Sequence, residues 1–209
     1  PHRVRQATAA MLALGSMGDP RILGDAGRLL SLRGIGAGML RGQTARALAR
    51  LTPDAVLPVA REWRDSRSFG KQYAARRILA EHATADDIDW VRIQLRRPFR
   101  LENIYPICDA VQIATRIGEY MPEVGRVFDL IPYSYGRHFA AEALRATDPD
   151  WASSRAHTSL WDCEEAVRLC AAESVRLTRP SEARLREMAA DQFEDERPRD
   201  AARARLASA

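Results

Sequence analysis

The chain repeats a nine-residue pattern along its length, and Gly136–Leu144 (GRHFAAEAL) is the clearest copy. The pattern has a basic residue at its second place, a small residue at its sixth and an aliphatic residue at its ninth. The second places are residues 5, 41, 71, 104, 137, 168 and 199, which lie 30 to 36 residues apart. A period of this length is typical of folds built from one repeated supersecondary unit. The copies are Val4–Leu12, Leu40–Leu48, Gly70–Ile78, Asn103–Val111, Gly136–Leu144, Val167–Val175 and Pro198–Leu206.

The pattern predicts a helix with a flat packing face. Its sixth and ninth places are three residues apart, so they share one side of an α-helix. Small side chains at the sixth place allow a neighbouring helix to approach closely. Arg203 departs from the pattern in the last copy, where a terminal unit has one neighbour fewer and can be polar. The other sixth places are Ala9, Ala45, Ala75, Cys108, Ala141 and Ala172, and the ninth places are Leu12, Leu48, Ile78, Val111, Leu144, Val175 and Leu206.

Turn-forming residues separate the copies and indicate a unit of helix, tight turn and helix. Thr84 and Asp87 have the spacing of a capping box. Four glycines at 32–42 predict an irregular loop, and IPYSYG at 131–136 predicts a connecting turn with two exposed tyrosines. No segment of useful length alternates with period two, so we expect no β-sheet. Further turn signals lie at 18–20, 52–54, 147–150 and 179–182.

The pattern resembles the VRxxAAxxL helix of HEAT repeats, particularly the short bacterial, phycobilisome-lyase-like type, as VRLCAAESV at 167–175 illustrates. In that family, helix pairs stack into an armadillo-like superhelix whose second helices line the concave side. The resemblance implies an all-α, right-handed α-solenoid of about seven HEAT-like helix pairs in one domain over 1–209. The copy at 103–111 departs most, with Ile104 at the basic place and Pro106 in the first turn. Because the chain begins with Pro1, we expect a piece of a longer protein.

The composition is that of an ordinary soluble protein: 46% hydrophobic and 29% charged residues, with a net charge of +4. The sequence contains no apolar run of about 18 residues, so we predict no membrane-spanning helix in it. Cys108, Cys163 and Cys170 have unpaired spacings that fit a reducing compartment, so we expect a cytoplasmic protein. The sequence contains no HExxH or CxxC motif, so we predict no metal site, and we expect no cofactor.

The sequence gives little support for catalysis. Cys163 and His157 could form a nucleophile pair, but a buried thiol and a surface histidine are the simpler interpretation. Trp151, near Asp148 and Asp150, resembles the tryptophan and aspartate that some HEAT-like DNA glycosylases use. Neither of these two features belongs to a wider catalytic motif, so we favour a non-enzymatic function.

The basic second places allow two interpretations. In stacked repeats they would form a row that could follow a phosphate backbone. Alternatively, each forms an ion pair with a loop carboxylate, and an arginine held by a bidentate ion pair is not available to a ligand. We favour the ion pairs, with Asp19, Asp54, Asp87 and Asp148 as partners. The row comprises Arg5, Arg41, Lys71, Arg137, Arg168 and Arg199.

The seventh places change sign along the chain. Arginine occupies the second and third copies, whereas acids occupy the fourth to sixth. A uniform nucleic-acid groove would not contain three consecutive acids, whereas a surface of both signs suits a complementary protein partner. An ordinary solvated face of mixed charge is the alternative. We predict a non-enzymatic protein–protein interaction scaffold that binds a protein partner or another domain of the same polypeptide. The predicted contact residues are Arg46, Arg76, Asp109, Glu142 and Glu173, with Tyr105 and His138 beside them.

The alternative function is a nucleic-acid-binding HEAT-like module. Four arginines lie within the ten residues that follow Trp90, and Phe99 lies among them. Basic residues interleaved with aromatic ones can bind nucleic acid. Trp90 and Ile93 are expected to face the core. The basic cluster comprises Arg92, Arg96, Arg97 and Arg100.

Overall fold

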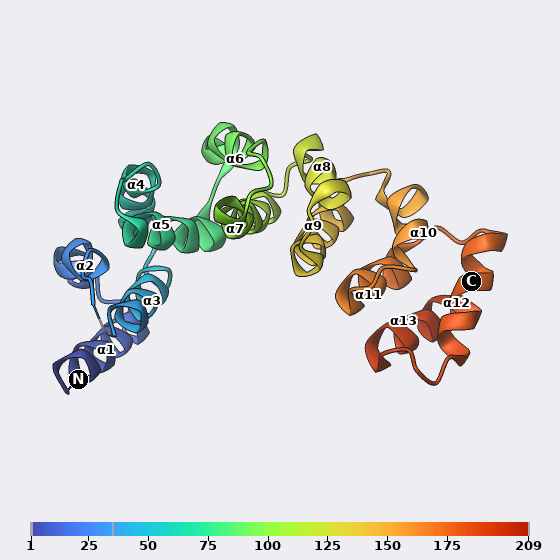
Figure 1. The fold of residues 1–209 in the computed structure, drawn as a ribbon, viewed down its shortest axis with the longest axis horizontal. Coiled ribbons are helices and arrows are strands. Elements are labelled where there is room, and N and C mark those ends of the chain that lie inside the picture. Colours follow the sequence, from blue (N-terminus) through green and yellow to red (C-terminus); the bar gives the residue numbers. More distant parts are fainter. Residues whose placement is uncertain (1, 35, 209) are drawn as a thin grey trace. The chain divides into compact units, whose positions relative to one another are not determined.

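The computed structural model describes residues 2–34 and 36–208, with side chains from Gln6 onward, and it is all-helical over these ranges (Figure 1). The all-α prediction is confirmed. The α-helices are α1 (His2–Ser16), α2 (Ile22–Leu30), α3 (Ala37–Leu48), α4 (Pro53–Trp63), α5 (Phe69–His82), α6 (Ile88–Leu95), α7 (Leu101–Ile117), α8 (Pro122–Leu130), α9 (Ser134–Thr147), α10 (Arg155–Ser159), α11 (Glu165–Ser174), α12 (Arg179–Ala190) and α13 (Glu196–Ala207), with 3-10 helices η1 (Ala85–Asp87) and η2 (Trp151–Ser153).

The chain forms two compact units, unit 1 (Pro1–Ile88) and unit 2 (Asp89–Ala209). In unit 1, α1 packs on α3 and α3 packs on α5, while α2 covers α3 and α4 covers α5 (Figure 1). Each of α1, α3 and α5 carries one copy of the nine-residue pattern. The pattern therefore marks the helices that contact one another in succession.

Unit 2 follows the same plan. Its pattern-bearing helices α7, α9, α11 and α13 pack in succession, and α8, α10 and α12 cover α9, α11 and α13 respectively (Figure 1). Helix α6 buries Trp90, as predicted, together with Val91 and Leu95. Ile93, predicted to face the core, is instead 60% exposed. The buried residues of α6 lie at 90, 91, 94 and 95, so position 93 points away from their face.

The packing face of the pattern is buried in the five central copies. There the sixth-place alanines and Cys108 have at most 4% of their surface exposed, and the aliphatic ninth places at most 1%. Small residues are suited to this place because they allow the next pattern-bearing helix to approach closely, as α1 and α5 do on α3, and α9 and α13 on α11. The buried residues at these places are Ala45, Ala75, Cys108, Ala141 and Ala172, and Leu48, Ile78, Val111, Leu144 and Val175.

The two end copies differ from the central ones: the first departs from the expectation, whereas Arg203 in the last is on the solvent side as expected. In α1 Thr8, Met11 and Gly15 are buried, whereas Ala9 is exposed and Leu12 is 40% exposed. In α13 the buried small residue is Ala202, so Arg203 lies on the solvent side. The pattern-bearing neighbour of α1 is α3, and that of α13 is α11.

Most turn signals lie where helices begin. Thr52 is the N-cap of α4, and Pro53 is the first residue of that helix. The capping box of Thr84 and Asp87 is confirmed, because the Thr84 backbone N–H donates to Asp87 Oδ2 at 3.2 Å.

The two predicted loops are shorter than the sequence suggested. Helix α3 begins at Ala37 instead of after residue 42, since Gly34 and Gly36 adopt positive φ angles and complete the reversal early. The turn predicted at 131–136 ends before Ser134, where α9 begins. Tyr135 therefore lies in the first turn of a helix.

Gly70 allows the first turn of α5 to pack directly on the end of α2. A Cβ atom at position 70 would lie 2.0 Å from the carbonyl oxygen of Leu30 and 2.9 Å from Cδ of Arg41. The first of these is a backbone atom that cannot move aside easily. We expect Gly70→Ala to destabilise unit 1 by about 1–3 kcal/mol, the usual cost of overpacking. Urea unfolding followed by circular dichroism would show a lower midpoint.

Gly42→Ala is the matched control, because Gly42 lies inside α3 and an added Cβ there meets no atom within 4 Å. Alanine favours a helix over glycine by about 1 kcal/mol, so this variant should keep or raise the midpoint. Equal midpoints for the two variants would contradict the described contact between α2 and α5.

Candidate interaction surface

Arginine side chains connect successive helix pairs of unit 2, and in unit 1 Arg61 connects α4 to η1. Each contact joins residues 24 to 31 apart, about the length of one repeat. The acceptor is a carboxylate in some contacts and a backbone carbonyl oxygen in others. Because a guanidinium has a fixed fork of donors, such contacts fix the orientation of one helix pair on the next. The ion pairs are Arg61–Asp87, Arg96–Glu123, Arg137–Asp162, Arg145–Glu173, Arg155–Asp129 and Arg168–Glu194, and the carbonyl contacts are Arg126–Leu95, Arg184–Leu160 and Arg205–Val175.

The ion-pair interpretation of the basic second places is confirmed for Arg137 and Arg168. Arg137 donates from Nε and Nη2 to the two oxygens of Asp162 at 3.0 and 2.9 Å. Arg168 donates from Nη2 to Glu194 at 2.7 Å and to Asp195 at 2.7 Å. These acids are not the ones predicted. They lie immediately before the next pattern-bearing helix, α11 or α13.

Other members of the row have different contacts. Arg41 donates from Nη1 to the carbonyl oxygen of Leu32 at 2.8 Å. The Lys71 ammonium lies 5.4 Å from the ring centre of Trp63. The side chain of Arg5 lies outside the described residues. The row is therefore not a uniform series of exposed cations.

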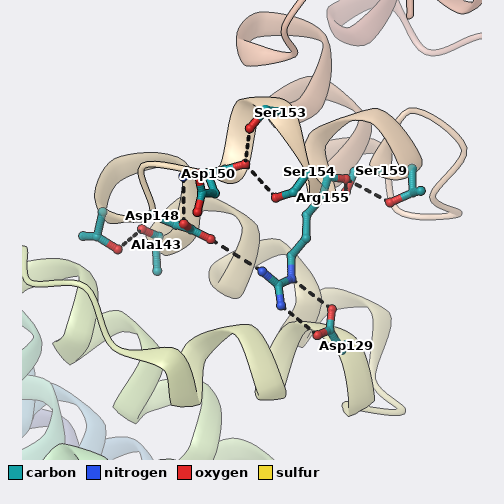
Figure 2. Close-up of polar contacts among 10 residues, drawn as sticks. Asp129, Ala143, Asp148, Asp150, Ser153, Ser154, Arg155 and Ser159 are labelled. Carbon is teal, nitrogen blue, oxygen red and sulfur yellow. Dashed lines mark hydrogen bonds and ion pairs between the residues drawn. The ribbon is translucent and has the colours of Figure 1, made fainter. Parts of the chain in front are cut away.

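Three predicted partner acids bind other arginines. Asp19 accepts hydrogen bonds from Arg21, and Asp87 accepts them from Arg61 and Arg64. Figure 2 shows the third, Asp148, at the junction of α8 with the η2–α10 segment.

In this junction Arg155 donates from Nε and Nη2 to the two oxygens of Asp129 at 3.1 and 3.0 Å, and its Nη1 lies 3.5 Å from Asp148 Oδ2 (Figure 2). The other oxygen of Asp148 accepts the backbone N–H of Asp150 at 2.9 Å. A Cβ atom on Gly125 would lie 3.1 Å from the Arg155 Nη2 atom. A small residue in α8 thus leaves room for the guanidinium.

Asp87 is the most buried carboxylate of these contacts, with a fully buried side chain. Burial alone would raise its pKa. Hydrogen bonds from Arg61 and from the backbone N–H of Thr84, with the charge of Arg64, outweigh this and lower the pKa below its ordinary value of 3.8. Its contribution to stability is therefore present above about pH 4 and is lost as the pH falls through the lowered pKa.

We expect Asp87→Asn to destabilise the protein by about 2–3 kcal/mol at pH 7, because it weakens charge-assisted hydrogen bonds from two arginines. The difference from the unmodified protein should shrink as the pH falls below about 4, where the native carboxylate also becomes protonated. Urea midpoints measured from pH 7 to pH 2.5 would test both statements.

Asp86→Asn is the matched control, since the Asp86 side chain is 78% exposed and touches Arg61 only at 3.4 Å. Exposed ion pairs contribute little to stability, so this variant should unfold within about 0.5 kcal/mol of the unmodified protein. A loss at position 86 equal to that at position 87 would refute the assigned role of the Asp87 contacts.

Aromatic rings gather where α7 and α9 begin. Tyr105 packs edge-on against Tyr133 with ring centres 6.0 Å apart, and Tyr135 lies 5.0 Å from Phe139 and 5.7 Å from His138. Tyr105 is 66% exposed and Tyr135 is 48% exposed, so the cluster presents apolar area to solvent. Burial and neighbouring groups raise the pKa of Tyr133, so the phenol stays protonated. We call these five residues the aromatic surface.

The sequence predicted this surface in part. Tyr105 and His138 were predicted contact residues, and the tyrosines of 131–136 were predicted to be exposed. Phe139 was missed because the fourth place of the pattern holds residues of many types, including Gln43 and Pro106. The periodicity gave no signal there.

The predicted acids lie on the same helices. Asp109 of α7, Glu142 of α9 and Glu173 of α11 share one place in the pattern, and these helices pack in that order, so the acids follow one side of unit 2. Glu142 lies 3.0 Å from the His138 Nε2 atom, and Glu173 pairs with Arg145. We call Asp109, Glu142 and Glu173 the acidic row.

The two predicted basic contact residues differ in exposure. Arg46 is exposed and lines, with Arg50 and Arg77, a shallow groove of about 390 Å³ between α3 and α5. Arg76 is only 8% exposed, so its assignment to the surface was wrong. Helix α5 buries residues 74, 75 and 76 consecutively, which is a wider buried face than the pattern implies.

The alternative nucleic-acid cluster contains an acid. Arg96 donates from Nε to Glu123 at 3.0 Å, and Arg92 Nε lies 4.0 Å from the other oxygen of Glu123. Burial would raise the pKa of Glu123, but its hydrogen bonds and the two arginines lower it, so it remains charged. Arg97 and Arg100 are exposed. The cluster is therefore partly neutralised.

The residues considered for catalysis have structural contacts. Trp151, considered for its likeness to a glycosylase tryptophan, is 1% exposed and donates from Nε1 to Ser174 Oγ at 2.8 Å, so its indole is held inside the fold. Cys163 was expected to be buried but is exposed, and its sulfur accepts from Arg137 Nη2 at 3.2 Å. The His157 ring packs on Trp161.

The other two cysteines serve as small core residues. Burial raises the pKa of the Cys108 and Cys170 thiols to about 11. Both thiols are free and uncharged at neutral pH. Their apolar character suits the packing between successive helices.

Within residues 2–34 and 36–208, no three His, Cys, Asp or Glu side chains gather as a possible metal site. No helix in these ranges is long and apolar enough to cross a membrane. The chain matches no protein-family model, no curated protein and no solved structure. Its function must therefore be argued from its own surfaces.

Proposed function

We propose that this chain is a non-enzymatic, HEAT-like α-solenoid scaffold that binds a protein partner or another domain of the same polypeptide. The successive packing of α1, α3 and α5 in unit 1, and of α7, α9, α11 and α13 in unit 2, supports a repeat arrangement. We assign it to the cytoplasm because its three cysteines are free thiols.

The aromatic surface is the observation that carries this proposal. Exposed tyrosines contribute disproportionately to protein–protein binding because they combine large apolar area with a polar hydroxyl and few rotatable bonds. Here Tyr105 and Tyr135 are held by ring contacts with Tyr133 and Phe139, so their positions are fixed before a partner binds. A preformed site of this kind costs little entropy on binding.

The acidic row indicates the chemistry of the partner. Asp109, Glu142 and Glu173 lie on the helices that carry or adjoin the aromatic surface. Arginine and lysine side chains stack on aromatic rings and pair with carboxylates. We therefore assign to unit 2 a partner segment that carries arginine or lysine.

Nucleic acid is the less favoured partner for unit 2. Phosphates would be repelled by the acidic row, and Arg92 and Arg96 already lie against Glu123. Unit 2 has 18 Arg and Lys residues against 20 Asp and Glu, so its net charge is about −2. Electrostatic attraction of a polyanion needs clustered positive charge.

Fluorescence anisotropy with a labelled decapeptide of alternating arginine and glycine would test the proposal. We expect the protein to bind this peptide at micromolar concentration, and Tyr105→Ala/Tyr135→Ala to bind it at least tenfold more weakly, about 1.4 kcal/mol. Each ring that faces a cation contributes about 0.5–1 kcal/mol at an exposed site. Circular dichroism should show unchanged helix content.

Phe193→Ala is the matched control, since Phe193 is an 87% exposed aromatic residue of unit 2 outside the aromatic surface. It should bind the peptide like the unmodified protein. Equal affinities of the double variant and this control would refute the assignment. A 20-base-pair duplex that displaces the peptide, with an affinity that falls steeply with salt, would favour nucleic acid instead.

A further inference from the structure

Three arginines meet in one groove of unit 1, where α5 begins. The groove has a volume of about 320 Å³, and its lining includes Arg33, Arg41, Arg67, Ser68 and Phe69. None of the residues that line it is acidic. Positive charges that line one groove repel one another, and an anion bound among them would offset this repulsion. We call this the three-arginine groove.

Comparison with the later copies of the pattern shows where an acid would be expected in the groove. Arg41 occupies the second place of its copy, like Arg137 and Arg168. Those two arginines bind acids 25 to 27 residues further along the chain, Asp162 for the first and Glu194 with Asp195 for the second. In both cases the acid precedes the next pattern-bearing helix by a few residues or fewer.

The same offset from Arg41 leads to Ser66, Arg67 and Ser68, which directly precede α5. The chain thus supplies an arginine at the position where the two later copies supply a carboxylate. The nearest acid in the sequence, Asp65, lies 3.6 Å from Arg64 Nε. Arg41 therefore occupies the same place in its copy as Arg137 and Arg168. The position that holds a carboxylate in those copies holds the positively charged Arg67 here.

Close packing holds Arg41 at this position. Its Cδ atom lies 2.9 Å from the point where a Cβ would be on Gly70, and its Nη1 donates to the Leu32 carbonyl oxygen. The first turn of the 14-residue helix α5 forms one wall of the groove. Its backbone N–H groups and positive helix-dipole end add to the attraction of the arginines for an anion.

The surroundings indicate an acidic peptide. Unit 1 contains 14 Arg and Lys residues against eight Asp and Glu, a net charge of +6. Phe69, in the groove lining, is 67% exposed and offers an apolar contact beside the charged one. Aspartate and glutamate are the occupants in the two later copies, which makes a carboxylate the ligand with an internal precedent.

We propose that the three-arginine groove binds a carboxylate side chain of an acidic, partly apolar segment of a protein partner. The ligand would complete the bidentate contact that Asp162 provides for Arg137. This inference rests on the proposed scaffold function. It adds a second site, of opposite charge to the aromatic surface and acidic row.

Arg67→Glu is the decisive variant, because it places a carboxylate 26 residues after Arg41, as Glu194 lies 26 residues after Arg168. We expect this protein to have an unfolding midpoint at least as high as the unmodified one, since the new side chain can pair with Arg41. We expect it to bind a labelled decapeptide of glutamate, glycine and leucine at least tenfold more weakly by anisotropy. The unmodified protein should bind the glutamine version of that peptide weakly.

Arg28→Glu is the matched control, since it makes the same charge change in unit 1 at a 71% exposed arginine outside the groove. Equal losses of peptide binding in the two variants would overturn the proposal, as general charge would then explain the affinity. Arg33→Gln provides a second, milder test in the groove lining and should also weaken binding of the glutamate peptide.

Two further outcomes separate this inference from the scaffold proposal. If Arg67→Glu leaves binding of the glutamate peptide unchanged while Tyr105→Ala/Tyr135→Ala still loses the arginine peptide, the groove assignment alone fails. If a 20-base-pair duplex binds more tightly than the glutamate peptide and Arg67→Glu abolishes that binding, the groove takes phosphate and the peptide assignment is overturned.

Discussion

The close contact between successive pattern-bearing helices is the constraint on which the rest of the structure depends. A single helix pair cannot bury its own apolar face, so each pair must use the next one. Ala75, Ala141 and Ala172 are fully buried at these contacts, and Cys108 takes the same place in α7. Small side chains bring the helices together, while Leu48, Ile78 and Leu144 fill the space beside them. A larger residue at the sixth place would separate two helices and expose both ninth places.

The arginine contacts add orientation to this packing. Burial of alanine and leucine is not directional, whereas a guanidinium bound through two nitrogens to one carboxylate fixes an angle as well as a distance. Arg137, Arg155 and Arg168 each connect one helix pair to the next in this way. The three-arginine groove differs from these contacts, because Arg41 and Arg67 both line it and no acid does. A structural contact can therefore become a binding site by one change of residue.

The two units offer surfaces of different chemistry. Unit 2 exposes tyrosines near carboxylates, and unit 1 exposes guanidinium groups beside Phe69. Under the proposed scaffold function, complementary charges at each site would select the partner segment that binds there. Trp151 and Asp148 are both buried and hydrogen-bonded within the fold.

The sequence alone determined the helical class, the repeat period and the helix starts at Thr52 and Thr84, because small and aliphatic spacing and capping are local properties. It also placed Tyr105, His138 and the acidic row on one side of a helix series. Tertiary structure decided which face of α1 and α13 is buried, since that depends on how each helix packs against its neighbour. It also decided that Arg76 is buried and that Arg137 forms its ion pair with Asp162. Arg137 and its acid lie 25 residues apart in the chain. A nine-residue pattern therefore cannot predict which acid pairs with which arginine.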